Sequence, residues 1–517
     1  MAEQTASAPR PNILIVMTDH QRMDTVLPEH PCITPNLTRL GQNGLTFTNV
    51  FCPMAHCCPA RATFHSGLYP SRHGVWNNVN NAYAINRGPH EHIRMWSQDL
   101  RAAGYDLAHC GKWHVSALDH QTPADYGWRE LHPYRGNIQS TPGKWEAIRE
   151  SADQPEPDAA IRMPGYQPHD LYGTDEAGGR GDERTTQHAL DELPELAAGD
   201  KPWCLYIGWN GPHAPYKAAR RFVDMYDPDD IPLPPSFGDE MADKPDYYGK
   251  LRKRVFDQLG ERGTKDAIRH FWAMCTHLDE MFGRVLAALE ATGQADNTLV
   301  LYCSDHGDYA GDHGLFHKQV PSFLGAYKVP AVVRWPRGVR APGRRVDDFI
   351  SLADFAPTFL DLAGVTPTHY FTGRSFRPFL ENRPPADWRT EICMQCEGTE
   401  NLFTQRQVVT QEYKYVYNGF GRDELYDLAN DPHELVNRID DPQLASVLRD
   451  LVGRMWRFAY LEQDRLGSTQ YLMVNTAPWG PKEAFRGEAG RNLPTAVPLG
   501  QENEFTAVGR KATPDTK

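Results

Sequence analysis

Short apolar segments alternate with helical segments along most of this chain, and this alternation limits the folds open to it. The apolar segments read as buried strands, and they cover residues 11–18, 45–50, 104–110, 203–209, 298–303 and 330–334. The segments between them have helical patterns, at residues 34–43, 59–66, 95–103, 183–198, 264–291 and 351–363. Strands that alternate with helices predict an α/β fold with a mostly parallel central sheet sandwiched by helices. We expect Thr34 to cap the first helix, since it directly precedes Pro35.

The pattern changes after about residue 384. Short strands are expected at residues 390–396, 407–410 and 413–418, followed by a helix at 442–458. We therefore predict a catalytic domain over residues 1–384 and a smaller C-terminal α+β subdomain of antiparallel strands and one helix over 385–464. Residues 465–517 are rich in Gly, Pro and polar side chains. We expect this tail to be extended or packed on a neighbour, which would be a route to a homo-oligomer.

Composition excludes several classes of protein. The 517 residues carry a net charge of −13, which disfavours binding to nucleic acid. No apolar run approaches the ~20 residues of a membrane span, and the first residues lack the basic and apolar regions of a signal peptide. A cytoplasmic protein is the expectation. The ten cysteines have no dense regular spacing, so a disulfide scaffold is not expected, and Cys393 and Cys396 are interpreted as buried thiols.

Polar clusters follow four of the predicted strands. They are Asp19-His20, Lys112 with His114, His213, and Asp305-His306. Ligands of open α/β sheets bind beyond the carboxyl ends of the strands. The clusters are therefore expected to converge on one site, although they are far apart in the sequence.

One segment near these clusters has the residues of a hydrolase nucleophile. Cys57, Pro59 and Arg61 form a C-x-P-x-R motif, which His-Ser-Gly follows at residues 65–67. Together with G-K-W-H at 111–114, P-H-A-P-Y at 212–216, S-D-H-G-D at 304–308 and Lys318, this motif resembles the signature of the type I sulfatases of the alkaline phosphatase superfamily. Tyr426-Asp427-Leu428 resembles part of that family's C-terminal subdomain, so the similarity extends over roughly residues 11–460. The resemblance implies an alkaline-phosphatase-like fold.

The resemblance also implies a modified nucleophile. In this family a formylglycine-generating enzyme oxidises the cysteine of C-x-P-x-R, here Cys57, to formylglycine, and the hydrated aldehyde attacks the sulfur of a sulfate ester. A thiolate would form an S-sulfated enzyme with no easy way to release sulfate, whereas a geminal diol expels sulfate by collapsing to the aldehyde. Cys58 occupies the variable position of the motif and is expected to be inert.

A divalent metal ion is the second implication of the resemblance. Asp19, Asp305, His306 and the modified residue 57 would hold the ion, with His20 as a possible further ligand. Calcium is the expectation from the family, and Mg²⁺ or Mn²⁺ remain alternatives. His20 stands where many sulfatases have a second aspartate. The ligand atoms of this metal site would therefore include nitrogen as well as oxygen, unlike those of a typical calcium site.

Further site residues follow from the negative charge of the substrate and transition state. Arg61 would fix the diol, Lys112 and Lys318 would bind sulfate oxygens, and His213 would be an acid toward the leaving group, a role that Lys318 would share. His114 is a candidate base for sulfate expulsion. Further residues that could line the pocket are Asn77, Asn78 and Gln21.

Other functions compete with sulfate ester hydrolysis. A phosphonate monoester or phosphodiester hydrolase of the same superfamily can share the formylglycine, but such relatives tend to replace the equivalents of Lys112 and His114 with neutral hydroxyl-bearing residues. A catalytically inactive binding protein is a further alternative, as is a zinc site made by Cys52, His56 and Cys57. The sequence predicts a small sulfate ester as substrate, either a sugar, an alkyl or an aryl sulfate.

Overall fold

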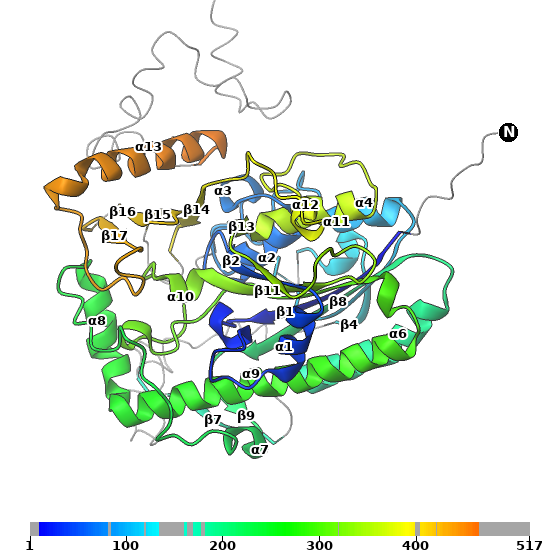
Figure 1. The fold of residues 1–517 in the computed structure, drawn as a ribbon, viewed down its shortest axis with the longest axis horizontal. Coiled ribbons are helices and arrows are strands. Elements are labelled where there is room, and N and C mark those ends of the chain that lie inside the picture. Colours follow the sequence, from blue (N-terminus) through cyan, green and yellow to red (C-terminus); the bar gives the residue numbers. More distant parts are fainter. Residues whose placement is uncertain are drawn as a thin grey trace, which may run out of the picture.

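The computed structural model describes residues 10–80, 84–117, 120–133, 160–162, 169–176, 181–318, 320–398, 404–419 and 421–464. Two sheets and the helices that cover them make up most of this part of the chain (Figure 1). The predicted tail, residues 465–517, lies outside the described residues.

The large sheet is mostly parallel, as predicted. From edge to edge its strands are β12 (Arg344–Val346), β2 (Leu45–Phe51), β11 (Lys328–Arg334), β10 (Thr298–Ser304), β1 (Asn12–Asp19), β8 (Trp203–Pro212), β3 (Asp106–Gly111) and β4 (Arg129–Pro133), with β13 (Ile350–Ser351) beside β2. All neighbours from β10 to β4 run parallel. β11 is antiparallel to both β10 and β2.

Alternate residues of β1 enter two separate cores. Ile13, Ile15 and Met17 belong to one apolar cluster, and Leu14 and Val16 belong to another. Successive side chains of a strand point to opposite faces, so the strand is apolar throughout because both faces are covered. The covering helices are α2 (Cys57–Ser66), α4 (Trp96–Ala102) and α11 (Phe355–Leu362) on one face and α6 (Asp182–Ala198) and α9 (Gly260–Ala291) on the other (Figure 1).

The helix α1 (Pro35–Gln42) begins where predicted, but its cap comes from elsewhere. The expectation for Thr34 is wrong, because its hydroxyl donates to the carbonyl of Thr25 and makes no capping bond. The carboxylate of Asp279, on α9, accepts hydrogen bonds from the backbone N–H groups of Asn36 and Leu37 at 3.0 and 2.8 Å. A distant carboxylate thus satisfies the free donors of the first turn.

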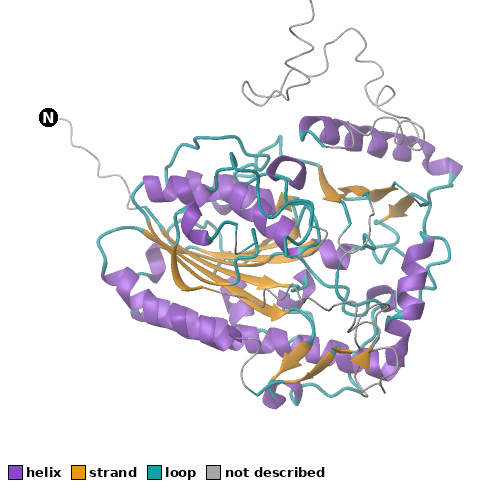
Figure 2. Ribbon diagram, turned by 180° about the vertical axis from the view of Figure 1, so that it is seen from behind, coloured by secondary structure: helices purple, strands orange, loops and turns teal. Residues whose placement is uncertain are grey.

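A second, antiparallel sheet follows in the sequence. Its strands are β14 (Glu391–Cys396), β15 (Gln405–Thr410), β16 (Tyr413–Asn418) and β17 (Glu424–Asp427), paired in that order. Helix α13 (Ala445–Leu461) lies along this sheet, as Figure 2 shows. It packs on the sheet through a separate apolar core. Cys393 and Cys396 are buried free thiols, as the sequence indicates.

Shorter elements complete the described part of the chain. They are α3 (Pro70–His73), α7 (Arg220–Val223), α8 (Asp246–Arg254), α10 (Leu324–Tyr327), α12 (Arg377–Leu380), β5 (Ala160–Ile161), β6 (His169–Asp170), β7 (Tyr172–Thr174) and β9 (Tyr216–Ala218). None of the helices that the structure describes has both the length and the apolar character needed to cross a bilayer.

Candidate active site

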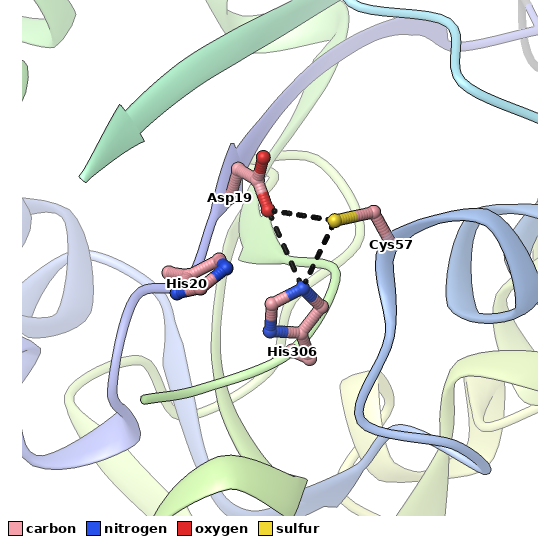
Figure 3. Close-up of side chains that lie close together, drawn as sticks. All are labelled: Asp19, His20, Cys57 and His306. Carbon is pink, nitrogen blue, oxygen red and sulfur yellow. Dashed lines mark hydrogen bonds and ion pairs between the residues drawn. The ribbon is translucent and has the colours of Figure 1, made fainter. Parts of the chain in front are cut away.

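The carboxyl ends of β1 and β10 meet the N-terminal end of α2 at Cys57. Asp19 is the last residue of β1, and His306 follows the end of β10. The Sγ atom of Cys57 lies 3.5 Å from Oδ1 of Asp19 and 3.3 Å from Nε2 of His306 (Figure 3). Parallel strands bring their carboxyl ends to one edge, so residues separated by more than two hundred positions come into contact. The predicted convergence is therefore present.

Two buried lysines lie close to Cys57. Nζ of Lys318 lies 3.3 Å from Sγ of Cys57, and Lys112 forms an ion pair with Asp19. Each lysine is only 6% exposed. Burial by itself would raise the pKa of the Cys57 thiol, but Lys112, Lys318 and His306 outweigh it and hold that pKa well below its usual value.

The adjacent Cys58 has the opposite environment. Burial and the neighbouring Cys57 raise the pKa of its thiol far above the ordinary range. Its backbone N–H donates to Oδ1 of Asn78 at 3.1 Å, which places Asn78 beside the first turn of α2. The two cysteines therefore differ in chemistry although both are buried.

Arg61 contacts the carboxylate of Asp305 rather than standing free in the pocket. Its Nε lies 2.7 Å from Oδ2 of Asp305, and both side chains are fully buried. Its remaining N–H groups donate to the carbonyls of Thr18 and Lys112 and to the hydroxyl of Tyr206, at 3.2–3.3 Å. Arg61 thus ties α2 to the ends of β1, β3 and β10.

The histidines predicted for the site lie around it. His114 lies in the loop after β3, and it makes a smaller contribution to lowering the pKa of Cys57. Burial and Lys112 lower the pKa of His114 itself, which favours its neutral form. The ring of His213 is half-buried, and its centroid is 4.1 Å from that of His20. Gln21 is buried and bonded to Thr25, behind the site.

The contacts of His20 bring two residues to the site that the sequence analysis does not assign to it, Asp308 directly and Tyr216 through Asp308. Nδ1 of His20 lies 2.7 Å from Oδ2 of Asp308, and the hydroxyl of Tyr216 donates to the same oxygen at 2.9 Å. Asp308 and Tyr216 are the last residues of the S-D-H-G-D and P-H-A-P-Y motifs, and that position is the signal in the sequence. Burial, with Lys318 and His213 nearby, holds the pKa of His20 well below its usual value, so its imidazole is neutral.

The donor atoms fit a divalent cation. Asp19, His20, Cys57 and His306 are all buried, and each offers one ligand atom within 4.8 Å of the others. Asp305 lies next to this group, but Arg61 contacts one of its oxygens and the backbone N–H of His306 donates to the other at 2.8 Å.

The charges agree with this fit. Burial and Lys318 lower the pKa of His306, but Asp305, Cys57 and Asp19 raise it to about 9, because these acidic groups lie around its ring. Among the described residues no cluster contains Cys52, His56 and Cys57 together, so the zinc alternative finds no support.

Comparison with known proteins agrees with this geometry. The sulfatase family model matches residues 11–365, and the model of the C-terminal part of N-sulphoglucosamine sulphohydrolase matches residues 311–460. The chain is 28% identical to the uncharacterized sulfatase YidJ of Escherichia coli, over 91% of this chain and 90% of that protein. It is 29% identical to a choline-sulfatase of Rhizobium meliloti, with 86% and 87% covered.

Solved structures share the fold. BT4656, solved with its substrate D-glucosamine-2-N,6-O-disulfate, superposes with a TM-score of 0.69 at 22% identity, over 88% of this chain and 98% of that chain. The phosphonate monoester hydrolase of Agrobacterium radiobacter superposes with a TM-score of 0.69 at 25% identity, over 90% and 96%. The family model covers well over half of the sequence, and the chain therefore belongs to the sulfatase family, within the alkaline phosphatase superfamily.

Proposed function

We propose that this protein hydrolyses a small sulfate monoester with a formylglycine formed from Cys57. The observation that carries the proposal is the environment of Cys57: Lys112 and Lys318 place positive charge around one buried atom at the end of the sheet. A sulfate ester is anionic, and more charge gathers on its oxygens in the transition state. The pocket is arranged to stabilise that charge.

The modified side chain explains why a cysteine stands at residue 57. A hydrated formylglycine has two hydroxyls on one carbon, one to attack sulfur and one to lose its proton when sulfate is expelled. Neutral His114 is the candidate base for that proton, because its lowered pKa leaves it free to accept one. A formylglycine-generating enzyme would be a required partner during biosynthesis.

The remaining residues bind the sulfate and assist departure of the alcohol. Lys112 and Lys318 would contact sulfate oxygens from two sides of residue 57. His213, which is half-buried beside His20, would donate a proton to the leaving oxygen, together with Lys318. Arg61 would act by holding Asp305 and the loop after β3 in place.

A divalent metal ion would be held by Asp19, His306 and residue 57, with Asp305 alongside and His20 as a further ligand. When bound, such an ion polarises the sulfate group and lowers the pKa of the attacking hydroxyl. Calcium is the family expectation for this ion.

The substrate class is proposed from the relatives and from the pocket. The relatives include a choline-sulfatase and BT4656, which was solved with a sulfated glucosamine, so alkyl and sugar sulfates are both candidates. Phosphonate monoester hydrolysis is the second candidate, because a phosphonate monoester hydrolase shares the fold at 25% identity. Lys112 and His114 favour sulfate, because the phosphonate monoester and phosphodiester hydrolases that share the formylglycine tend to have neutral hydroxyl-bearing residues at these two positions.

One experiment tests both the nucleophile and the reaction. The full chain is produced with and without the formylglycine-generating enzyme, and the Cys57 peptide is examined by mass spectrometry. Turnover is then measured on choline sulfate, glucosamine sulfates, aryl sulfates and phosphonate monoesters. We expect sulfate turnover only in the preparation whose residue 57 is lighter by the exchange of SH₂ for O.

Cys58→Ala is the matched control for Cys57→Ala. We expect Cys57→Ala to abolish turnover and Cys58→Ala to keep most of it, because the Cys57 sulfur contacts Lys318 and its thiol pKa is lowered, whereas the thiol pKa of Cys58 is raised. Equal loss in the two variants, or full activity of a protein with unmodified Cys57, would contradict the proposal. Faster turnover of phosphonates than of every sulfate would select the second candidate.

A further inference from the structure

The most informative unassigned feature of the site is the set of contacts around His20. Its ring is fully buried between the rings of His213 and His306, with centroids 4.1 and 4.4 Å away. The residue has a φ of 74°, in the left-handed region that a non-glycine residue rarely adopts. The fold therefore holds this imidazole in one orientation at the edge of the candidate metal site.

Asp308 determines which nitrogen of His20 carries the proton. Oδ2 of Asp308 contacts Nδ1 of His20 and accepts the hydroxyl of Tyr216. Oδ1 accepts the backbone N–H groups of Ala310 and His317 at 2.9 and 3.0 Å. Burial raises the pKa of Asp308 to about 7, and these donors oppose that rise by stabilising the carboxylate form, which accepts the proton on Nδ1 of neutral His20.

A second contact gives the same tautomer independently. Nε2 of His20 contacts the ammonium of Lys318, which also lies 3.3 Å from Sγ of Cys57. An ammonium group has no lone pair and can only donate, so Nε2 is the acceptor. Nε2 therefore carries a lone pair, and it faces the nucleophile.

His306 is held in the same way. Its Nδ1 lies 2.8 Å from the carbonyl oxygen of Gly307, while Nε2 faces Cys57 and Asp19. Histidines that bind metals commonly direct the other ring nitrogen to a carboxylate or a backbone carbonyl, which fixes the tautomer and the ring. The site thus presents two imidazole nitrogens beside the carboxylate of Asp19 (Figure 3), and the carboxylate of Asp305, which Arg61 holds, lies next to them.

We propose that Nε2 of His20 is a metal ligand, positioned by Asp308 and Tyr216, and that the site accordingly prefers Mn²⁺ to Ca²⁺. Calcium selects oxygen donors and six to eight ligands, whereas imidazole suits first-row transition ions. This inference rests on the proposed metal-dependent function. It replaces calcium, the family expectation, by an ion that binds nitrogen ligands more readily.

Metal binding is measured directly, without an activity assay. The full chain is treated with a chelator, and Mn²⁺ and Ca²⁺ are titrated separately by calorimetry. We expect Mn²⁺ to bind the unaltered protein at least about 10-fold more tightly than Ca²⁺. His20→Gln keeps a polar side chain but removes the imidazole, and it should weaken Mn²⁺ binding by about 10- to 100-fold. Asp308→Asn removes the carboxylate that supports His20, and it should weaken Mn²⁺ binding by a similar factor. Ca²⁺ binding should change much less in His20→Gln.

His433→Gln is the matched control, because His433 is exposed and lies outside the group of donor atoms. It should leave both affinities unchanged. Pulsed electron paramagnetic resonance of bound Mn²⁺ provides a second measurement that does not depend on a variant folding. The unaltered protein should show couplings to two imidazole nitrogens.

Two outcomes would overturn the inference. One is tighter binding of Ca²⁺ than of Mn²⁺ by the unaltered protein, and the other is coupling of Mn²⁺ to a single imidazole nitrogen. Failure of the proposed function is distinguishable, because a protein that binds Mn²⁺ through two nitrogens but hydrolyses no sulfate ester would refute the substrate class alone.

Discussion

Replacement of Arg61 by methionine tests a fully buried ion pair of the site. Arg61 and Asp305 are both fully buried, and the guanidinium also donates to two carbonyls and a hydroxyl. Arg61→Met conserves much of the volume but leaves a buried carboxylate without its cation. Removing one partner of such a pair costs about 3–5 kcal/mol in the free energy of unfolding.

The cost should depend on pH, and its sign follows from the titration of Asp305. Burial already raises the pKa of Asp305, and Arg61 opposes that rise. Without Arg61 the pKa of Asp305 in the folded state rises further above its value in the unfolded state, so the ionisation of Asp305 destabilises the fold as the pH rises. A protonated Asp305 avoids the penalty, so the destabilisation should be small near pH 5 and should grow as the pH rises toward 8.

Denaturant unfolding of chelator-treated protein, followed by tryptophan fluorescence at several pH values, measures this effect. The double variant Arg61→Met with Asp305→Asn should unfold at a higher denaturant concentration than Arg61→Met alone, because it has no buried carboxylate at residue 305. Arg345→Met is the matched control, since Arg345 and Glu29 form an exposed pair worth no more than about 1 kcal/mol. The reasoning fails if Arg61→Met is within about 1 kcal/mol of the unaltered protein at pH 8, or if the second substitution rescues nothing.

Two further predictions concern catalysis and the fold. Lys318→Met should lower kcat/KM for a sulfate ester by about 100- to 1000-fold, because a cation that stabilises the transition state is lost. Lys328→Met, on β11, is the control and should change kcat/KM less than about 3-fold. Steady-state kinetics on the modified protein measures both effects, and equal effects would count against the role of Lys318. Asp279→Ala should lower the free energy of unfolding by about 1–2 kcal/mol and leave kcat unchanged, because Asp279 caps α1 and not the candidate site. Thr34→Ala is the comparison, and a larger loss of stability in Thr34→Ala than in Asp279→Ala would show that the cap is misassigned.

The sequence by itself predicted the central strands and helices well, because their signals are local. Apolar runs such as residues 298–303 and the three- and four-residue spacing over 264–291 need no knowledge of distant residues. The structure extends β10 to Thr298–Ser304 and α9 to Gly260–Ala291. β4 (Arg129–Pro133) was not predicted, because its short polar sequence has no apolar run.

The candidate site was also visible in the sequence, but only as a set of residues. The polar residues at strand ends and the C-x-P-x-R motif pointed to Asp19, Cys57, Lys112 and His306, since a parallel sheet gathers its carboxyl ends. The partners of these residues were not predictable from spacing. Arg61 is on the helix face of Cys57, yet its charge is directed to Asp305, 244 positions away.

Tertiary structure alone decided the finer chemistry. The tautomer of His20 depends on Asp308, 288 positions later, and the cap of α1 depends on Asp279, 243 positions later. Such contacts depend on how whole elements pack, and sequence patterns report only which faces are apolar. The sequence therefore determined the fold class and pointed to Cys57, and packing determined the charges, the proton positions and the metal preference that we infer.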